Sequence, residues 1–337
     1  MKENANILLL FGGGGTEHDI SKISSKYVLQ NLQKIDGLNP IAVELTKDGK
    51  YLASNDRQCH LSLTGHLVYL DNRERLKIDY AIPCLHGYPG ETGDIQSLFE
   101  LASIPYFGCD KEASQNCFNK VTSKLWFDAL QIPNTPSVFL SNSSLDELEK
   151  ARAFYRQYGQ VFVKAASQGS SVGCYWVTDE KNLEMSIIEA FNFSQHVLVE
   201  KALKARELEI SAYEYQGKVV VTRPGEIIIP ENNFYSFDEK YSAKSHTRTE
   251  IVAQHLSEEQ IHSMQKIAKK AFIGMKLRHL SRIDFFLTRE GDIYLNEINT
   301  FPGMTEISMF PKMLENHGHQ FHLFLKEHIE ASLNKAQ

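Results

Sequence analysis

Residues 280–308 read LSRIDFFLTREGDIYLNEINTFPGMTEIS, a pattern that predicts a β-hairpin running into a Pro-Gly turn. Residues 282–287 and 293–299 are two short runs rich in Ile, Phe, Tyr and Leu, residue types that favour strands. The segment between them, TREGD, consists of residues that favour turns. We therefore expect two antiparallel strands joined by a short loop that is symmetric about residues 290–291.

One face of this hairpin would carry four polar side chains, because side chains two apart on a strand point to the same side. Asp284 would face Glu297, and Arg282 would face Asn299; we call these four residues the hairpin quartet. Opposed carboxylates repel each other, and a divalent cation would neutralise them. Two carboxylates and an amide oxygen are hard ligands that suit Mg²⁺ bridging to phosphates. The alternative is a solvated outer face on which Arg282 pairs with the acids.

Composition limits the class of protein. The chain has 337 residues, which suggests two or three domains, and a formal net charge of −6, which argues against a nucleic-acid partner. It has no apolar run of about 18 residues and no signal peptide, so no membrane partner is expected. Its five cysteines show no CxxC spacing. We expect them to be reduced thiols in a cytoplasmic protein.

The amino-terminal segment predicts the start of a Rossmann-like unit. A buried-type strand at residues 6–11 is followed by GGGGTEHDIS and an amphipathic helix at residues 21–32. Glu17 lies just after the strand, at the sheet edge where open α/β sheets place ligands. The alternative is a carboxylate stabilised by the helix macrodipole.

A second strand, at residues 79–85, places another ionisable group at the same edge. His86 follows this strand directly, and the turn GYPGETGD then leads into a helix from about residue 95. A satisfied buried histidine is the alternative for His86. Two loops that carry ionisable groups at one sheet edge together predict a small-molecule site.

The middle of the chain carries phosphate-binding features. A helix that begins near residue 111 has Lys120 and Lys124 four residues apart on one face. Lys164 ends a strand that leads into the loop SQGSSVG, whose backbone N–H groups can approach phosphate oxygens closely. The alternative is an ordinary hairpin turn. Further on, the linker EKAL that begins at Glu200 can pair with an adenine edge, and Glu207 can bond ribose hydroxyls.

Together these segments resemble the ATP-grasp superfamily, and specifically the D-alanine–D-alanine ligases. The resemblance runs from about residue 7 to 317 and rests on FGGGGTEHDIS, LHGYPGETGDIQ, IPYFG, NKVTSK, FVKAASQGSSVG, VEKALKARELE, FYSFDEKY, SRIDFFL and LNEINTFPGMTEIS. Three positions depart from the family pattern: Thr92, Ala165 and Ala205. They affect the expected shape of local loops rather than the reaction class.

The resemblance implies an α/β fold of the ATP-grasp type, with α+β elements. It implies a Rossmann-like domain at residues 1–115, a central ATP-grasp subdomain at 116–213 and a carboxy-terminal subdomain at 214–337. The last of these would carry the metal site and a lid at residues 234–249, a polar segment without apolar periodicity.

The implied activity is the ATP-dependent ligation of two D-alanines through an acyl phosphate, for peptidoglycan precursor synthesis. The implied cofactors and partners are ATP, D-alanine and two Mg²⁺ (or Mn²⁺) ions per site, in a homodimer. One alternative is a D-alanine–D-serine or D-alanine–D-lactate ligase, or another ATP-grasp carboxylate–amine ligase. A catalytically inert nucleotide-binding regulator is disfavoured because the metal acids, both lysines and the arginine are all present.

The resemblance also implies a role for each nucleotide-site residue. The lysines Lys120 and Lys164 would hold the phosphates, and the turn from Gly169 to Ser171 would close over them. The adenine would bind at Glu200, Lys201, Ala202 and Leu203, and the ribose at Glu207. The metal ions would bind at Asp284, Glu297 and Asn299.

A second set of residues is implied in substrate binding and catalysis. The oxyanion hole would consist of Arg282 and the backbone N–H of Gly303. The first substrate's ammonium would pair with Glu17, supported by Ser170 and Tyr241. The second substrate's carboxylate would be held by Ser308, Met309 and Lys240, and His86 joins the substrate-binding set. A tyrosine at position 241, where a histidine would carry charge near neutral pH, favours D-alanine as the second substrate.

Overall fold

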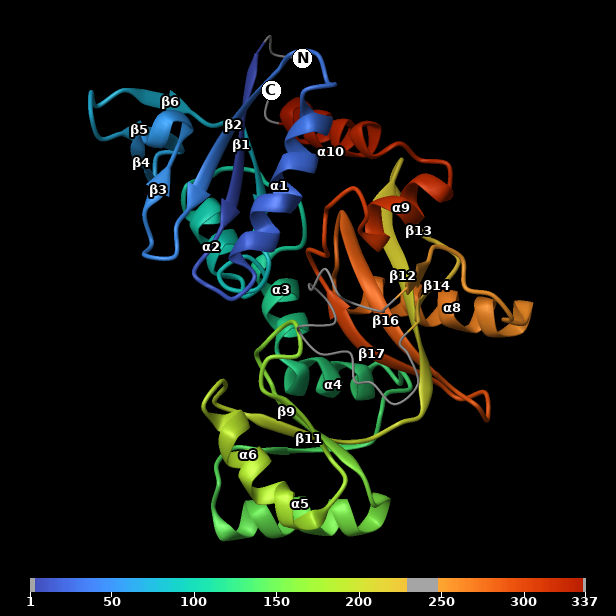
Figure 1. Ribbon diagram of the computed structural model, residues 1–337. Coiled ribbons are helices and arrows are strands. Elements are labelled where there is room, and N and C mark those ends of the chain that lie inside the picture. Colours follow the sequence, from blue (N-terminus) through green and yellow to red (C-terminus); the bar gives the residue numbers. More distant parts are fainter. Residues whose placement is uncertain (1–3, 229–247, 336–337) are drawn as a thin grey trace.

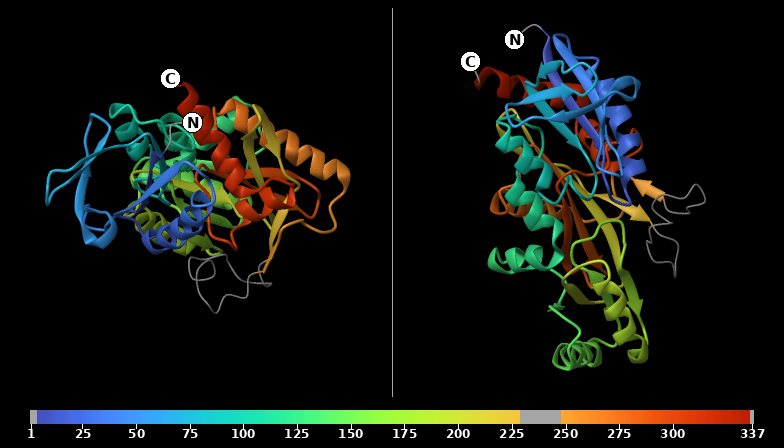
Figure 2. Two further views of the ribbon diagram at one scale, coloured as in Figure 1. Left: turned by 90° about the horizontal axis from the view of Figure 1, so that it is seen from above. Right: turned by 90° about the vertical axis from the view of Figure 1, so that its left-hand side faces the viewer.

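The computed structural model describes residues 4–228 and 248–335. Three β-sheets follow one another along the chain, which we call the amino-terminal, central and carboxy-terminal sheets (Figure 1). The amino-terminal sheet lies at one end of an elongated molecule and the central sheet at the other, with the carboxy-terminal sheet between them (Figure 2). Within the two described ranges, every helix falls short of the length and hydropathy that a bilayer-spanning segment needs.

The amino-terminal sheet has seven strands in the order β6-β5-β4-β3-β2-β1-β7. Its strands are β1 (Ala5–Gly12), β2 (Leu38–Leu45), β3 (Tyr51–Leu52), β4 (Gln58–Leu61), β5 (His66–Tyr69), β6 (Arg75–Lys77) and β7 (Tyr80–Cys84), and its helices are α1 (His18–Leu32), η1 (Ser54–Asp56) and α2 (Asp94–Leu101). β1 runs parallel to β2 and β7. The predicted strand–turn–helix start and the strand at residues 79–85 are therefore confirmed.

The central sheet is antiparallel, in the order β10-β9-β11-β8. Its strands are β8 (Ser137–Leu140), β9 (Val161–Ala165), β10 (Cys174–Val177) and β11 (Val197–Lys201), and the helices around it are α3 (Lys111–Phe118), α4 (Lys120–Ala129), α5 (Leu145–Tyr158), η2 (Glu180–Asn182) and α6 (Leu183–Phe191). The prediction of a single helix from residue 111 is wrong. Asn119 has an extended backbone and caps α4 by accepting from Val121 N at 3.0 Å, which divides the segment into two helices.

The carboxy-terminal sheet has the order β15-β14-β12-β16-β17, with β13 paired to β12. Its strands are β12 (Ala205–Tyr215), β13 (Lys218–Val221), β14 (Gly225–Ile228), β15 (Arg248–Glu250), β16 (Leu280–Thr288) and β17 (Ile293–Asn299), and the helices after β15 are α8 (Glu258–Gly274), α9 (Met309–Asn316) and α10 (Phe321–Lys335). β16 and β17 form the predicted hairpin.

The predicted hairpin register is confirmed at the quartet and fails beyond it. Asp284 pairs with Glu297, as expected, but Phe285 pairs with Leu295. Asn296 is therefore an extra residue on β17, a β-bulge directly beside the quartet. A loop symmetric about residues 290–291 would instead pair Phe285 with Asn296 and leave no bulge.

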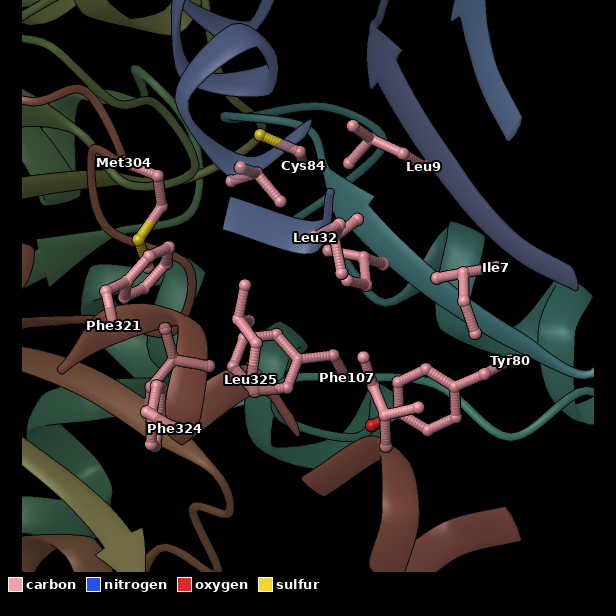
Figure 3. Close-up of a cluster of buried hydrophobic side chains, with 14 of the residues drawn as sticks. Ile7, Leu9, Leu32, Tyr80, Cys84, Phe107, Met304, Phe321, Phe324 and Leu325 are labelled. Atoms are coloured by element: carbon pink, nitrogen blue, oxygen red, sulfur yellow. The ribbon is translucent and has the colours of Figure 1, made fainter. Parts of the chain in front are cut away.

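The last helix completes the core of the first domain. Phe324 of α10 is fully buried in one cluster with residues of β1, α1 and β7, including Ile7 and Leu32 (Figure 3). Burying such a side chain contributes about 1.5–3 kcal/mol. The two ends of the chain therefore stabilise each other, and they fix the amino-terminal sheet against the loop that follows β17.

Candidate active site

A cleft of about 770 Å³ is lined by residues of both the central and the carboxy-terminal sheets. This volume is typical of small-molecule sites. The predicted site residues that line it are Lys120, Lys164, Ser170, Ser171, Glu200, Lys201, Ala202, Leu203, Glu207, Arg282, Asp284 and Glu297. Residues predicted from distant segments of the chain thus converge on one cavity.

A buried carboxylate organises the central-sheet side of the cleft. Glu200, on β11, is 2% exposed and forms ion pairs with Lys164 and, at 2.7 Å, with Lys124 Nζ. Burial alone would raise the pKa of Glu200, but the two ammonium groups outweigh this effect and lower the pKa to about 2. The same attraction raises the pKa of Lys164 against the effect of burial. Both groups are therefore charged at neutral pH.

The loop between β9 and β10 approaches the cleft from the same side. Ser170 and Ser171 have φ values of 50° and 60°, a left-handed backbone conformation that residues other than glycine seldom adopt. Such strain is often found in ligand-binding loops. Lys120 Nζ donates to the carbonyl of Gln168 at 2.7 Å and lies 3.6 Å from Glu297 Oε2. Lys120 therefore links this loop to the hairpin quartet.

The hairpin quartet is held in a tight ionic arrangement. Arg282 donates Nε and one terminal nitrogen to the two oxygens of Asp284, each at 2.8 Å. Asn299 Nδ2 donates to Asp284 at 3.0 Å, and Arg282 Nε also lies 3.2 Å from Glu209. The side chains of Arg282 and Asp284 are only 22% and 13% exposed. The alternative of a solvated outer face is therefore wrong, although Arg282 does pair with the acid.

The charges around the quartet fit a divalent cation. Three carboxylates, those of Glu209, Asp284 and Glu297, lie in ion-pair contact with two cations, Arg282 and Lys120. Carboxylate oxygens are the ligands that Mg²⁺ and Mn²⁺ prefer. A cation bound by these oxygens would neutralise phosphate oxygens in the cleft.

The predicted first-substrate residues are brought together across the molecule. Glu17 directly precedes α1, and Ser170 Oγ donates a hydrogen bond to its carboxylate. A Cβ atom placed on Gly169 would lie 3.0 Å from Glu17 Oε2, and one on Gly87 would lie 2.8 Å from it. A side chain at either position would therefore crowd the carboxylate, and the φ of 64° at Gly87 also favours glycine.

The ring of His86 is bonded within the protein. It is 4% exposed, its Nε2 lies 2.8 Å from Ser24 Oγ, and its Nδ1 lies 3.2 Å from the carbonyl of Phe301. Burial lowers the pKa of His86. These contacts agree with the alternative of a satisfied buried histidine. A direct contact with substrate stays a prediction.

Glu91 has an unusual environment near Glu17. Its Oε1 accepts from Gly87 N at 2.9 Å. Burial and the nearby carboxylate of Glu17 raise the pKa of Glu91 to about 8. Glu91 therefore carries a proton at neutral pH and can share this loop with an ionised Glu17.

The predicted second-substrate residues lie at the start of α9. Ser308 precedes the helix, and its Oγ accepts from Thr305 N at 3.0 Å. A Cβ on Gly303 would lie 3.0 Å from this same Oγ. The side chain of Met309 is 5% exposed and packs with Ile227. Only the backbone amide of Met309 is therefore suited to bind a carboxylate, at a helix N-terminus that favours anions.

Two predicted residues, Lys240 and Tyr241, lie outside the described residues, as does most of the predicted lid. Of the segment 234–249, residues 248 and 249 are described, and they belong to β15.

Sequence reasoning missed Lys124, Glu209 and Glu91 as members of the site. Lys124 had a signal, because it follows Lys120 by one helical turn. Glu209 follows Glu207 on the same face of β12, but only the pairing of β12 with β16 places it opposite Asp284. No local signal marks the proximity of Glu91 to Glu17.

Comparison with known proteins agrees with this geometry. The family model described as D-ala D-ala ligase N-terminus matches residues 6–109, and the one described as D-ala D-ala ligase C-terminus matches residues 127–330. A D-alanine–D-alanine ligase of Vibrio vulnificus is 55% identical over 329 residues, covering 97% of this chain and 99% of the relative. A D-alanine–D-alanine ligase of Shewanella baltica is 54% identical over 329 residues, covering 97% and 98%.

Solved structures extend the likeness to the whole fold. The crystal structure of D-alanyl-alanine synthetase A from Vibrio cholerae matches with a TM-score of 0.93 and 52% identity, covering 99% of both chains. A D-Ala:D-Ser ligase from Enterococcus faecalis matches with a TM-score of 0.86 at 26% identity, covering 98% of this chain and 99% of that one. The expected ATP-grasp fold is thereby confirmed. The chain belongs to the D-alanine–D-alanine ligase family.

Proposed function

We propose that this protein ligates two D-alanines to D-alanyl-D-alanine, with conversion of ATP to ADP and phosphate, for peptidoglycan precursor synthesis. The hydrogen bond between Ser170 and Glu17 is the observation that carries the proposal. Ser170 belongs to the loop that borders the phosphate end of the cleft. A D-alanine whose ammonium is bound by Glu17 would therefore present its carboxylate to the terminal phosphate.

In the first step, a carboxylate oxygen of this D-alanine attacks the γ-phosphorus of ATP, and ADP leaves. Lys120 and Lys164 bind the phosphates, and the backbone of Gly169 and Ser171 covers them. Glu200 keeps Lys164 charged and in place. Positioning and charge neutralisation are the main demands of phosphoryl transfer.

In the second step, the neutral amine of another D-alanine attacks the carbonyl carbon of the acyl phosphate. Negative charge develops on the carbonyl oxygen, where Arg282 and the N–H of Gly303 stabilise it. Phosphate then leaves as the amide bond forms. The second carboxylate is held by Ser308, the Met309 amide and Lys240.

The nucleotide base is placed by the linker after β11. The amides of Lys201 and Ala202 donate to the carbonyls of Pro136 and Gln160, at 3.0 and 3.1 Å, which keeps the linker extended. In our proposal the adenine edge therefore pairs with the linker carbonyls and with Leu203. Glu207, which lines the same cleft, binds the ribose.

The metal requirement follows from the quartet. We propose that Asp284, Glu297 and Asn299 hold two Mg²⁺ or Mn²⁺ ions. When bound, the ions neutralise phosphate oxygens. Support comes from the donor set, because the carboxylates of Asp284 and Glu297 and the amide of Asn299 supply the oxygen ligands that these ions prefer.

The broader expectations from the sequence remain proposals. We propose domains at residues 1–115, 116–213 and 214–337, although β12 continues across the boundary at residue 213. We also propose a homodimer that works in the cytoplasm, where ATP is supplied. The five cysteines are free thiols, which is compatible with that compartment.

One assay separates this function from its alternatives. Purified protein is given ATP, Mg²⁺ and pairwise mixtures of D-alanine, D-serine and D-lactate, and ADP, phosphate and product masses are measured. We expect D-alanyl-D-alanine to dominate, with one phosphate released per dipeptide. L-alanine serves as the control. A dominant D-alanyl-D-serine or D-lactate product, or ATP turnover without product, would contradict the proposal.

A further inference from the structure

A second cavity, of about 610 Å³, shares no lining residue with the cleft. It lies where the amino-terminal sheet meets the carboxy-terminal sheet and α10, and its walls include the rings of Tyr80, Tyr106, His279 and His328. A cavity of this size holds a small organic molecule. Neither the nucleotide nor either D-alanine site uses it.

Tyr80 lines this cavity and has an unusual buried hydroxyl group. Tyr80 is 1% exposed, and its hydroxyl has no hydrogen-bond partner within the described chain. Its ring belongs to the apolar cluster that also contains Phe107 (Figure 3). A buried polar group without a partner is rare in folded proteins, and often marks a site for water or ligand.

The side chains of Arg278 and Lys335 line the same cavity, and neither has an acidic partner among the described residues. Arg278 Nε donates to the carbonyl of Gly108 at 3.0 Å, and its guanidinium lies 4.8 Å from the ring centre of Tyr106. No ion pair to Arg278 or to Lys335 is formed within residues 4–228 and 248–335. Burial raises the pKa of the Tyr80 hydroxyl, and the positive charge of Arg278 offsets part of this rise.

The acidic residues of the cavity wall are engaged elsewhere. Glu100 forms an ion pair with Lys111 at 2.7 Å, and its other oxygen accepts from Tyr106 at 3.0 Å. Glu214 accepts from the backbone of His279 at 2.8 Å, and Glu327 accepts from the backbone N–H of Gln216. Each acidic side chain of the wall therefore already has a partner other than Arg278 or Lys335.

We propose that this cavity binds a small organic anion whose carboxylate or phosphate group is held by Arg278 and the Tyr80 hydroxyl. The apolar part of the ligand would pack on the rings of Tyr106, His279 and His328. Arginine is suited to this role because its planar fork matches both oxyanions. The site is separate from the proposed ligase chemistry and would stand if that chemistry were different.

The test is calorimetric titration of phenyl phosphate and benzoate, with benzyl alcohol as the neutral control. ADP and Mg²⁺ are present in excess, so that the cleft is filled. We compare the wild type with Tyr80→Phe, Arg278→Gln and, as a charge-matched control, the exposed Arg73→Gln. Comparison of the two anions shows whether a phosphate or a carboxylate is preferred.

We expect the wild type and Arg73→Gln to bind at least one anion and not benzyl alcohol. Tyr80→Phe should bind about tenfold or more weakly, the effect of one hydrogen bond to a charged group. It should unfold at the same or a higher temperature, because the hydroxyl has no partner in the described chain. Tyr80→Phe therefore tests the proposed anion site even if Arg278→Gln does not fold.

Two results would overturn the proposal. One is the absence of anion binding to the wild type up to about 10 mM. The other is equal affinity in wild type, Tyr80→Phe and Arg278→Gln, which would place the anion elsewhere.

Discussion

Replacing Lys124 by methionine tests the buried ion-pair network under the nucleotide site. The change keeps an unbranched side chain as far as Cε and removes the charged Nζ, leaving Glu200 with Lys164 alone. The shift in the pKa of Glu200, from its ordinary 4.5 to about 2, is worth about 3 kcal/mol at about 1.4 kcal/mol per pH unit. Loss of one partner from a buried pair typically costs about 3–5 kcal/mol. We therefore expect Lys124→Met to lower the free energy of unfolding by about 3 kcal/mol at pH 7.

The chain offers a local probe for this measurement. It contains two tryptophans, Trp126 on α4 and Trp176 on β10. Urea unfolding followed by tryptophan fluorescence therefore reports on the part of the protein that holds Glu200. Lys181→Met is the matched control, because that lysine is 78% exposed and pairs only at the surface. Such a pair contributes about 0–1 kcal/mol.

The pH dependence gives a second readout. The pKa of Glu200 is lowered in the folded state, so its contribution is present above pH 4.5 and is lost as the pH falls towards 2. The wild type should lose this stability over that window, and Lys124→Met should lose less of it. A Lys124→Met protein as stable as the Lys181→Met control would refute the account of the network. So would an unchanged pH slope.

Three further predictions concern the metal site, the acid loop and the terminal helix. Glu297→Gln should lower Mg²⁺-dependent turnover about 100-fold or more without changing the circular dichroism, because an anionic ligand is lost; near-normal turnover would remove Glu297 from the metal site. Burial raises the pKa of Glu91 to about 8, so wild-type stability should fall between pH 5 and 8 in urea titrations, and Glu91→Gln should flatten that slope. Phe324→Ala, at a fully buried position, should cost about 3–5 kcal/mol in the same titrations, whereas a loss below about 1 kcal/mol would contradict the packing of α10.

The sequence predicted features that depend on local periodicity. Alternation of polar and apolar residues places Arg282, Asp284, Glu297 and Asn299 on one face, and the structure pairs them as expected. The bulge at Asn296 could not be predicted, because one extra polar residue within a short strand leaves no distinct pattern.

Contacts between distant segments were harder to predict. Glu200 was assigned to the adenine linker, and its burial between Lys124 and Lys164 depends on how α4 packs beside β11. The second cavity joins Tyr80, on β7, to Arg278, in the loop between α8 and β16. No sequence pattern around either residue predicts this proximity, which is seen only in the folded structure.

Transfer of an oxygen isotope tests the central claim most directly. The account requires a carboxylate oxygen of the first D-alanine, bound at Glu17, to attack the terminal phosphorus of ATP. D-alanine labelled with ¹⁸O in its carboxylate is incubated with the protein, ATP and Mg²⁺, and the released phosphate is analysed by mass spectrometry. We predict one ¹⁸O atom in each phosphate that accompanies a dipeptide. Unlabelled phosphate, or label in AMP, would contradict the proposed reaction.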